Sequence, residues 1–185
     1  MPAAKQPRKP QKPPQRAASS FRFRLVPASR RDAPAIVALH LAAAADLTNR
    51  FGRGHWSSRP TQRGVLLGMK RGVVYVVRRG RRLVATLTLT PRKPWAIDAT
   101  YFTPCVKPLY LVGMAVAPDW QGRGLGYFCM KQAQHLARIG RADALRLDAY
   151  DADAGAGEFY RKCGLREVGR ATYRDTPLVY FESRL

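Results

Sequence analysis

The chain has 185 residues, of which 46% are hydrophobic and 24% are charged, and no apolar run reaches the roughly 18 residues that a membrane span requires. Lys and Arg number 33 against 12 Asp and Glu, so the formal net charge is +21, and such a surface attracts polyanions such as nucleic acid, anionic lipid or phosphorylated small molecules. Cys105, Cys129 and Cys163 lie far apart without metal-ligand spacing, which argues against a disulfide framework and a zinc site.

The first 20 residues, MPAAKQPRKPQKPPQRAASS, contain five basic residues, five prolines and no acidic residue. Proline at this density prevents regular helix and sheet, so we expect a disordered basic tail over residues 1–20. The tail is either an electrostatic tether that contacts polyanions weakly or an extension without a function of its own. No secretory core follows this basic start, which predicts a soluble cytoplasmic protein.

The predicted domain spans residues 21–185 and opens with a strand. In FRFRLVPA the apolar residues alternate with arginine, which is the period of a half-exposed strand. Ser29 and Asp32 form a start similar to a capping box, which predicts a helix over residues 33–47. The elements expected next are a loop over 48–60, a short helix near 61–70, and a hairpin of strands 73–77 and 83–89 that turns at Gly80.

The second half of the chain continues the alternation of strands and helices. An irregular stretch over 91–108 leads to a strand over 109–116, and a glycine-rich segment with a helix follows. The last expected elements are a strand over 144–150, a short helix near 154–164, and strands over 165–173 and 178–185 joined by the turn RDTP. The order β-α-α-β-β-β-α-β-α-β-β predicts one α/β domain with a mixed sheet.

The glycine-rich segment, QGRGLG at residues 121–126, stands between a strand and a helix. It is not a P-loop, because Tyr127 follows the last glycine where that motif has lysine, and its GxGxG spacing does not fit a dinucleotide fingerprint. The first amides of a helix lack intrahelical acceptors, and with the helix dipole they form an anion site. Glycine lets a phosphate approach the backbone, and Arg123 adds positive charge. On spacing alone, a tight turn that binds nothing remains the alternative.

Two motifs carry a resemblance to a known family. The glycine segment resembles the pyrophosphate loop, Q/R-x-x-G-x-G/A, of the GNAT family of acetyl-CoA-dependent N-acetyltransferases, and AGEFYRKCGL resembles a second signature of that family, A-x-x-[FL]-Y-x-x-x-G-[FL]. The matching residues are Gln121, Gly124 and Gly126 in the first motif, and Ala156, Phe159, Tyr160, Gly164 and Leu165 in the second. The order of elements over 21–185 is also similar. The resemblance implies a GNAT-like acyltransferase fold, a central mixed sheet flanked by helices.

The resemblance implies an enzyme that transfers an acetyl group from acetyl-CoA to a primary amine, by direct attack in a ternary complex and without a metal. Acetyl-CoA would lie where strands 109–116 and 144–150 splay apart, with Gly113 in a bulge that aims an N–H at the thioester carbonyl. A monomer or homodimer is expected. The residues implied in cofactor binding are Met114, Ala115, Val116, Gln121, Gly122, Arg123, Gly124, Leu125, Gly126, Tyr127, Asp153 and Tyr160.

Tyr160 matches the family tyrosine near the sulfur of CoA, where a phenol acts as general acid or packs against the cofactor. Asp153 stands where the family often has asparagine, and a carboxylate can accept but not donate a hydrogen bond. The glutamate that the family often has on or near its central strand is absent from residues 109–116. The alternatives for the proton acceptor are His55, which could instead contact the acceptor, Asp98, or a water relay, unless the amine arrives already deprotonated. His40 and His135 are expected to be ordinary helix residues.

The acceptor amine is not identified by the sequence. Trp56, Trp95, Tyr101 and Phe102 form either an aromatic pocket or part of the core. The scarcity of acids argues against a polyamine and favours a small neutral or acidic amine, or a protein N-terminus. The alternative function is a basic nucleic-acid- or ribosome-associated protein that keeps the fold without catalysis. No RNP, KH or zinc-finger pattern supports that alternative.

Overall fold

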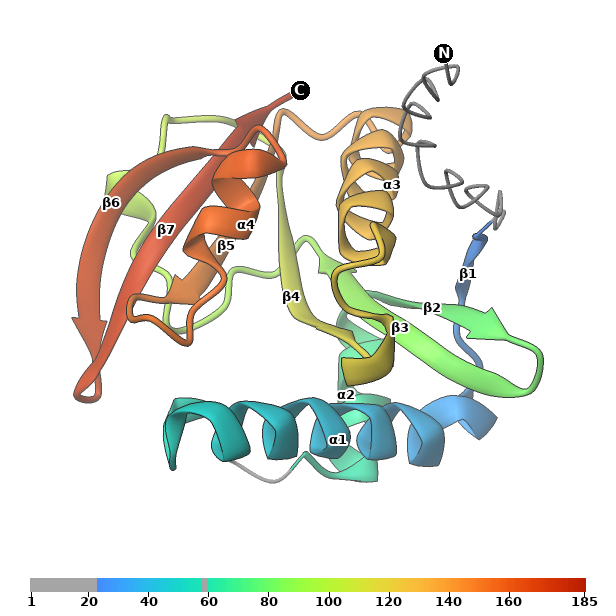
Figure 1. The fold of residues 1–185 in the computed structure, drawn as a ribbon. Helices are drawn as coiled ribbons and strands as arrows, with labels where there is room; N and C mark the ends of the chain where they lie inside the picture. Colours follow the sequence, from blue (N-terminus) through green and yellow to red (C-terminus); the bar gives the residue numbers. More distant parts are fainter. Residues whose placement is uncertain (1–22, 58–59) are drawn as a thin grey trace, which may run out of the picture.

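The computed structural model describes residues 23–57 and 60–185 (Figure 1). The tail predicted over 1–20 lies outside these described residues. The longer elements are β1 (Leu25–Pro27), α1 (Ala33–Phe51), α2 (Gln62–Arg71), β2 (Val73–Arg79), β3 (Arg82–Thr90), β4 (Pro108–Val116), α3 (Leu125–Ile139), β5 (Ala144–Tyr150), α4 (Gly157–Lys162), β6 (Arg166–Tyr173) and β7 (Thr176–Arg184). Short 3-10 turns are η1 (Arg30–Asp32), η2 (His55–Ser57), η3 (Ala99–Tyr101) and η4 (Pro118–Trp120). The predicted order of strands and helices is confirmed.

All seven strands belong to one mixed sheet, in the order β1-β2-β3-β4-β5-β7-β6. Neighbouring strands are antiparallel except for β4 and β5, which are parallel because helix α3 carries the chain back between them. This parallel pair extends only from Pro108 to Tyr110 on β4 and from Ala144 to Arg146 on β5. Beyond these residues the two strands separate, as the sequence predicts.

Helices cover both faces of the sheet. Figure 1 shows α3 and α4 in front of the strands and α1 crossing below them. The larger core packs α3 and α4 on β2, β3, β4, β5 and β7, and its centre includes the fully buried Leu87, Leu125 and Phe181. On the other face, Ile36 of α1 packs on Val74 and Val76 of β2, while the segment between β3 and β4 covers β7 through a separate cluster. Burial of apolar area on both faces holds the two divergent strands in place.

Hydrogen bonds fix both ends of helix α1. The Ser29 backbone N–H donates to Asp32 Oδ2 at 2.8 Å, and Arg78 of β2 donates to the other carboxylate oxygen at 2.6 Å. The helix runs to Phe51, four residues beyond the predicted end. In this added turn the Thr48 hydroxyl donates to the Ala44 carbonyl at 2.8 Å, and the helix ends where the Gly52 N–H donates to the Thr48 carbonyl.

The first strand is shorter than predicted. Strand β1 pairs with β2 only through Leu25–Pro27. Phe23 instead packs its ring against Trp120 of η4 and Phe128 of α3, with centroids 6.1 and 5.5 Å apart. The chain therefore enters the domain over the larger core before it joins the sheet edge. Within the described residues, no helix is long and apolar enough to cross a membrane.

Candidate active site

A cleft of about 920 Å³ opens where β4 and β5 diverge. Its walls come from both faces of the sheet, because residues of α3 and α4 line it on one side and residues of α1 and η2 on the other. The lining residues are His40, Ala43, Ala44, Leu47, His55, Trp56, Pro60, Gly113, Met114, Ala115, Val116, Gln121, Gly122, Gly124, Gly126, Tyr127, Ala154, Ala156, Phe159, Tyr160, Lys162 and Cys163. The cleft therefore passes through the sheet rather than lying on one face.

Strand β4 contains the bulge that the sequence predicts at Gly113. The pairing with β3 shifts between Thr86, opposite Ala115, and Thr88, opposite Val112, so that two residues of β4 face one of β3. Gly113 has a φ of +58°, a conformation that a side chain disfavours. The bulge interrupts the ladder with β3, and the residues from Gly113 to Val116 line the cleft.

The glycine turn leads from β4 through η4 into α3. The Gln121 side-chain amide donates to the Val116 carbonyl at 3.1 Å, which ties the turn to the end of the strand. Gly122 and Gly124 have φ values of +68° and +80°, and a Cβ on either would meet no atom within 4 Å. Gly124 is the N-cap of α3 and supplies no side-chain hydrogen bond to the first turn of the helix. The first amides of α3 are thus left to whatever binds in the cleft.

The third glycine serves a different purpose. A Cβ on Gly126 would lie 3.2 Å from Cε2 of Phe159, so its absence lets α3 approach α4 closely. Phe159 in turn packs edge-on against Tyr160, with centroids 5.2 Å apart. The two sequence motifs therefore meet in space at the cleft, although they lie about thirty residues apart in the chain.

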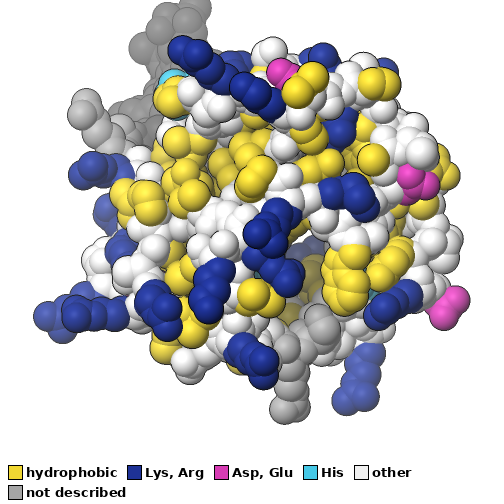
Figure 2. Space-filling model, turned by 180° about the vertical axis from the view of Figure 1, so that it is seen from behind, with side chains coloured by type: hydrophobic (Ala, Val, Ile, Leu, Met, Phe, Trp, Pro, Cys, Tyr) yellow, Lys and Arg dark blue, Asp and Glu magenta, His cyan; other side chains and the backbone are white. Residues whose placement is uncertain are grey.

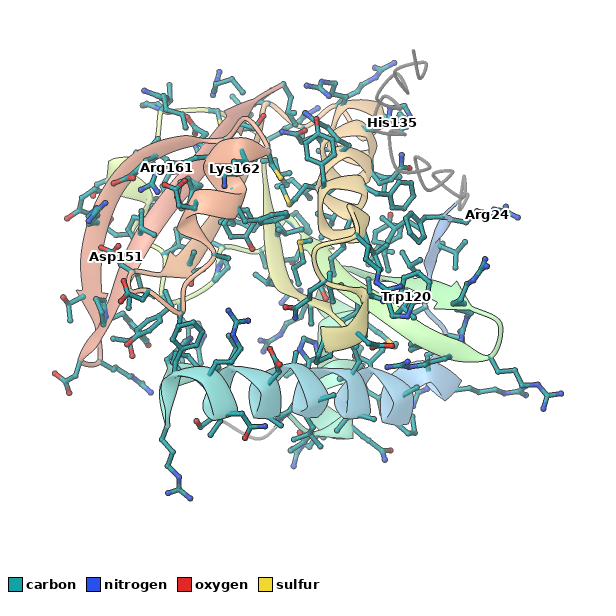
Figure 3. The ribbon with its side chains drawn as sticks, viewed as in Figure 1. Arg24, Trp120, His135, Asp151, Arg161 and Lys162 are labelled. Atoms are coloured by element: carbon teal, nitrogen blue, oxygen red, sulfur yellow. The ribbon has the colours of Figure 1, made fainter. Side chains whose placement is uncertain are left out.

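Most of the predicted cofactor-binding residues line the cleft, and three do not. Leu125 is completely buried in the core below the turn. Arg123 is exposed, with its guanidinium carbon 5.6 Å from the centre of the Trp120 ring. Asp153 is exposed in the loop before α4 and is not among the lining residues. Figure 3 places Trp120 between α3 and the β2–β3 hairpin, and Lys162 on α4.

Asp98 is not brought to the cleft. Its carboxylate accepts from the backbone N–H and the hydroxyl of Thr100 at 3.0 and 2.7 Å, and these hydrogen bonds lower its pKa. The backbone N–H of Asp98 donates to the hydroxyl of Tyr180 on β7, so Asp98 belongs to the segment that covers this strand. The structure thus places the Asp98 carboxylate at the cap of η3 and not among the described residues that line the cleft.

His55 lies at the end of the cleft formed by α1 and η2. Its ring stacks on Tyr150 at a centroid distance of 5.9 Å, and Trp56 packs edge-on against the same tyrosine at 5.6 Å. The Trp56 Nε1–H donates to the Thr48 hydroxyl at 3.2 Å, so the extension of α1 fixes this aromatic wall. Trp95 and Tyr101 are exposed elsewhere and Phe102 is buried in the smaller cluster, so only Trp56 of the four aromatic residues reaches the cleft.

Two residues that the sequence reasoning passed over belong to this region. His40 of α1 lines the cleft, contrary to its expected role as an ordinary helix residue, whereas His135 is exposed on α3 as expected. Asp148 of β5 is half-buried and interacts electrostatically with both His55 and Tyr160. The alternation of β5 was the available signal, because Asp148 is the one acid in an otherwise buried strand.

Tyr160 and Asp148 both favour their protonated forms more than usual. Burial raises the pKa of Tyr160, and the nearby Asp148 and Cys163 raise it further, so the phenol keeps its proton at neutral pH. Burial also raises the pKa of Asp148, which a hydrogen bond to its own backbone N–H and the proximity of His55 partly oppose. A protonated phenol inside a cleft can donate to a departing group.

A mixed sheet with a cleft between two diverging parallel strands, bordered by a glycine turn at a helix N-terminus, is the architecture that the resemblance to the GNAT acyltransferases implies. The model of the acetyltransferase (GNAT) family matches residues 41–165, more than half of the chain. The chain therefore belongs to this family and is a GNAT N-acetyltransferase. No curated protein sequence matches it significantly.

Solved structures share the fold at low sequence identity. A GNAT-family acetyltransferase from Streptococcus agalactiae superposes with a TM-score of 0.71 at 14% identity, covering 88% of this chain and 95% of its own. One from Listeria monocytogenes gives 0.68 at 17% identity over the same shares. The ribosomal-protein-S18-alanine N-acetyltransferase from Escherichia coli gives 0.61 at 14% identity, over 87% of this chain and 91% of its own. At such identities the comparison establishes the fold.

Proposed function

We propose that the protein transfers the acetyl group of acetyl-CoA to a primary amine by direct attack within a ternary complex. The observation that carries this proposal is the turn at Gly122 and Gly124, which presents the unpartnered amides of α3 to the same cleft that receives the β4 bulge. An anion at the amides and a thioester at the bulge fit the two ends of one CoA molecule.

The chain's own groups account for the steps of the transfer. Backbone groups of Met114 and Val116 pair with the pantetheine arm, and an N–H beside Gly113 stabilises the oxyanion that forms when the amine attacks. Tyr160 donates its proton to the sulfur as the C–S bond breaks. The phenol is protonated at neutral pH and so is present in the donor form, while its raised pKa makes it a weaker acid than a free tyrosine.

The acceptor enters from the side of α1 and η2. Trp56, Leu47 and Pro60 give that end of the cleft an apolar lining, and Asp148 is an acid that interacts electrostatically with His55 there. One carboxylate suits an acceptor with a single amine better than a polyamine, whose several charges need several acids. A small-molecule amine or a protein N-terminus fits, and the similarity in fold to an enzyme named for a ribosomal-protein alanine supports the second. His55 contacts the acceptor there.

Titration calorimetry with CoA tests the cofactor site. Gly124→Glu places a side chain on left-handed backbone and a negative charge where the diphosphate would bind, so CoA affinity should fall at least about 100-fold. Gly80→Glu is the matched control, because Gly80 has a φ of +58° with nothing within 4 Å of its Cβ position, at the tip of the β2–β3 hairpin. Equal affinities in the two variants would contradict the site.

An acceptor screen that detects the released thiol tests the reaction itself. Wild-type protein with acetyl-CoA should release CoA in the presence of its amine and not in its absence. A panel should include small aromatic and aliphatic amines and peptides with a free N-terminus. CoA binding without thiol release on any of them would contradict the proposed transfer to this class of acceptor.

A further inference from the structure

His40 lies in the cleft beside the bulge of β4. It lies in the middle of α1, and its imidazole atoms Cε1 and Nε2 lie 3.9 and 4.0 Å from the position that a Cβ would take on Gly113. Apart from the positions that flank Gly113, no other residue in the described parts of the chain comes within 4 Å of that point. The edge of the imidazole therefore faces the bulge of β4, where the proposed function places the thioester carbonyl.

The other residues of α1 that line the cleft leave space beside this imidazole. Ala43, Ala44 and Leu47 line the cleft on the following turns, at the spacing of one helix face. His40 is thus the one polar side chain that α1 contributes to the lining. Two alanines beside it leave space for an acceptor group to approach.

Burial lowers the pKa of His40, and no charged group contributes to that shift. On its own helix, Asp46 pairs with Arg50 at 3.5 Å. On η4, which packs against α1, Asp119 is held by Arg82 of β3.

The charged groups on the other elements around α1 either pair with one another, are exposed, or lie across the cleft from the imidazole. Asp32 of η1 pairs with Arg78, and the basic residues of α2 and η1 are exposed. Across the cleft lie His55, Tyr160 and Lys162, with Asp148 behind His55. The imidazole is therefore neutral at neutral pH, with a nitrogen free to accept a proton.

We propose that His40 accepts the proton that the attacking nitrogen loses, a role that rests on the acetyl transfer proposed above. The neutral amine forms a bond to the thioester carbon while its surplus proton passes to Nε2 of His40. The tetrahedral intermediate then collapses with cleavage of the C–S bond, and the sulfur receives the phenolic proton of Tyr160. Exchange with water returns both side chains to their first state, and the net change moves one proton from nitrogen to sulfur.

His40→Gln, His55→Gln and His135→Gln separate this assignment from its alternatives. Each removes an imidazole and keeps a polar side chain. Figure 3 places His135 at the end of α3 remote from α1, so its variant controls for loss of a histidine outside the cleft. Turnover, its dependence on pH, CoA affinity and melting temperature are measured for all three.

We expect His40→Gln to lower kcat about 100-fold or more while CoA affinity stays within about threefold. The sign of the pH effect follows from the lowered pKa: wild-type kcat falls when acid protonates His40, and this acidic limb disappears in the variant. Added imidazole should restore part of the turnover. His135→Gln should behave like the wild type.

Turnover of His40→Gln within about threefold of the wild type, with its acidic limb intact, would overturn the assignment. So would loss of that limb in His55→Gln alone. If His40→Gln does not fold, His40→Asn is measured in its place. A wild type that binds no CoA or releases no thiol would instead refute the proposed function, and the assignment with it.

Discussion

The glycines of the turn fix the cleft for two distinct physical reasons. Gly122 and Gly124 are needed for their left-handed backbone, since nothing crowds their Cβ positions. Gly126 is needed for space, since a Cβ there would press on Phe159. Substitutions at the first two positions act through strain and charge, and a substitution at the third acts through the packing of α3 on α4.

Gly126→Val should separate α3 from α4. The branched side chain would meet the Phe159 ring at less than van der Waals distance, which typically costs about 1–3 kcal/mol of folding free energy. Urea unfolding measures the loss, and calorimetry should show weakened CoA binding because Phe159 lines the cleft. Unaltered stability with normal CoA affinity would mean that the ring moves aside freely.

Tyr160→Phe should separate chemistry from binding. The variant keeps the ring that packs on Phe159 and Phe181 and removes only the hydroxyl. Loss of a general acid lowers turnover by about 100-fold or more, whereas CoA affinity should hardly change. Steady-state assays beside calorimetry provide the comparison, and unchanged turnover would remove Tyr160 from the role of proton donor.

Asp32 should link the stability of the domain to pH. Burial alone would raise its pKa, but hydrogen bonds from Arg78 and Ser29 and the charge of Arg78 prevail and lower it. A carboxyl with a lowered pKa stabilises the fold above its unfolded pKa of about 3.9, and this contribution is lost as pH falls through the folded value.

The melting temperature of Asp32→Asn should therefore lie below that of the wild type at pH 7. The gap should start to narrow as the pH falls below about 4 and should close once the pH passes below the lowered folded pKa, because Asp32 is then protonated in both folded and unfolded wild type. Asp153→Asn, at an exposed position, controls for the change in net charge. A gap that stays constant down to pH 2 would show that the charge on Asp32 contributes nothing.

Strand β5 is anchored at its far side by a buried ion pair. Arg146 donates from Nε to Glu182 of β7 at 3.0 Å, and its side chain also bonds to the Thr103 carbonyl and lies over the Phe102 ring. The two charged side chains are only 5% and 1% exposed. This cluster joins β5 and β7 to the segment between β3 and β4, beside the last residues of the parallel pairing.

Glu182→Ala should destabilise the domain by about 3–5 kcal/mol, because it leaves the Arg146 guanidinium buried without its counter-ion. Glu158→Ala breaks an exposed pair with Arg161 and should cost at most about 1 kcal/mol. Denaturant unfolding compares the two. Similar losses in both variants would show that Arg146 finds other partners, and replacing both Arg146 and Glu182 by apolar residues should recover most of the stability.

At the level of elements, the sequence predicts the strands and helices and their order, because hydrophobic periodicity and the turns at Gly80 and RDTP are local signals. The turn that the sequence singles out at residues 121–126 contributes Gln121, Gly122, Gly124 and Gly126 to the lining of the cleft. The sequence misses His40, since nothing local reveals that α1 crosses beneath β4. It also misses Asp148, although a single acid in the apolar pattern of β5 was a local signal. The position of Asp98 outside the cleft lining was not predictable either, because it depends on how the segment between β3 and β4 folds over β7.

The molecule as a whole is strongly basic, with a formal net charge of +21. Figure 2 shows Lys and Arg side chains spread over the back of the molecule, with few acidic side chains between them. Most of the acids present are engaged in ion pairs, such as Asp119 with Arg82 and Glu167 with Arg170. Such a surface favours polyanions without selecting a particular one.

Binding to a short RNA duplex should therefore be weak and should fall steeply as salt rises. Removal of residues 1–20, which carry five basic residues, should reduce the slope of log affinity against log salt by as much as about four to five. Fluorescence anisotropy over a salt series measures both. An unchanged slope would identify the segment as an extension without a role in polyanion contact.

The passage of the cleft through the sheet bears on the order in which molecules come and go. In the proposed reaction, acetyl-CoA enters the cleft beside α3 and α4, and the amine enters it beside α1. The two meet at the gap between β4 and β5. Free CoA then does not block release of the acetylated amine, and the acetylated amine does not block release of CoA. Product-inhibition kinetics should accordingly show that the two products leave in random order, even when the acceptor amine belongs to another folded protein.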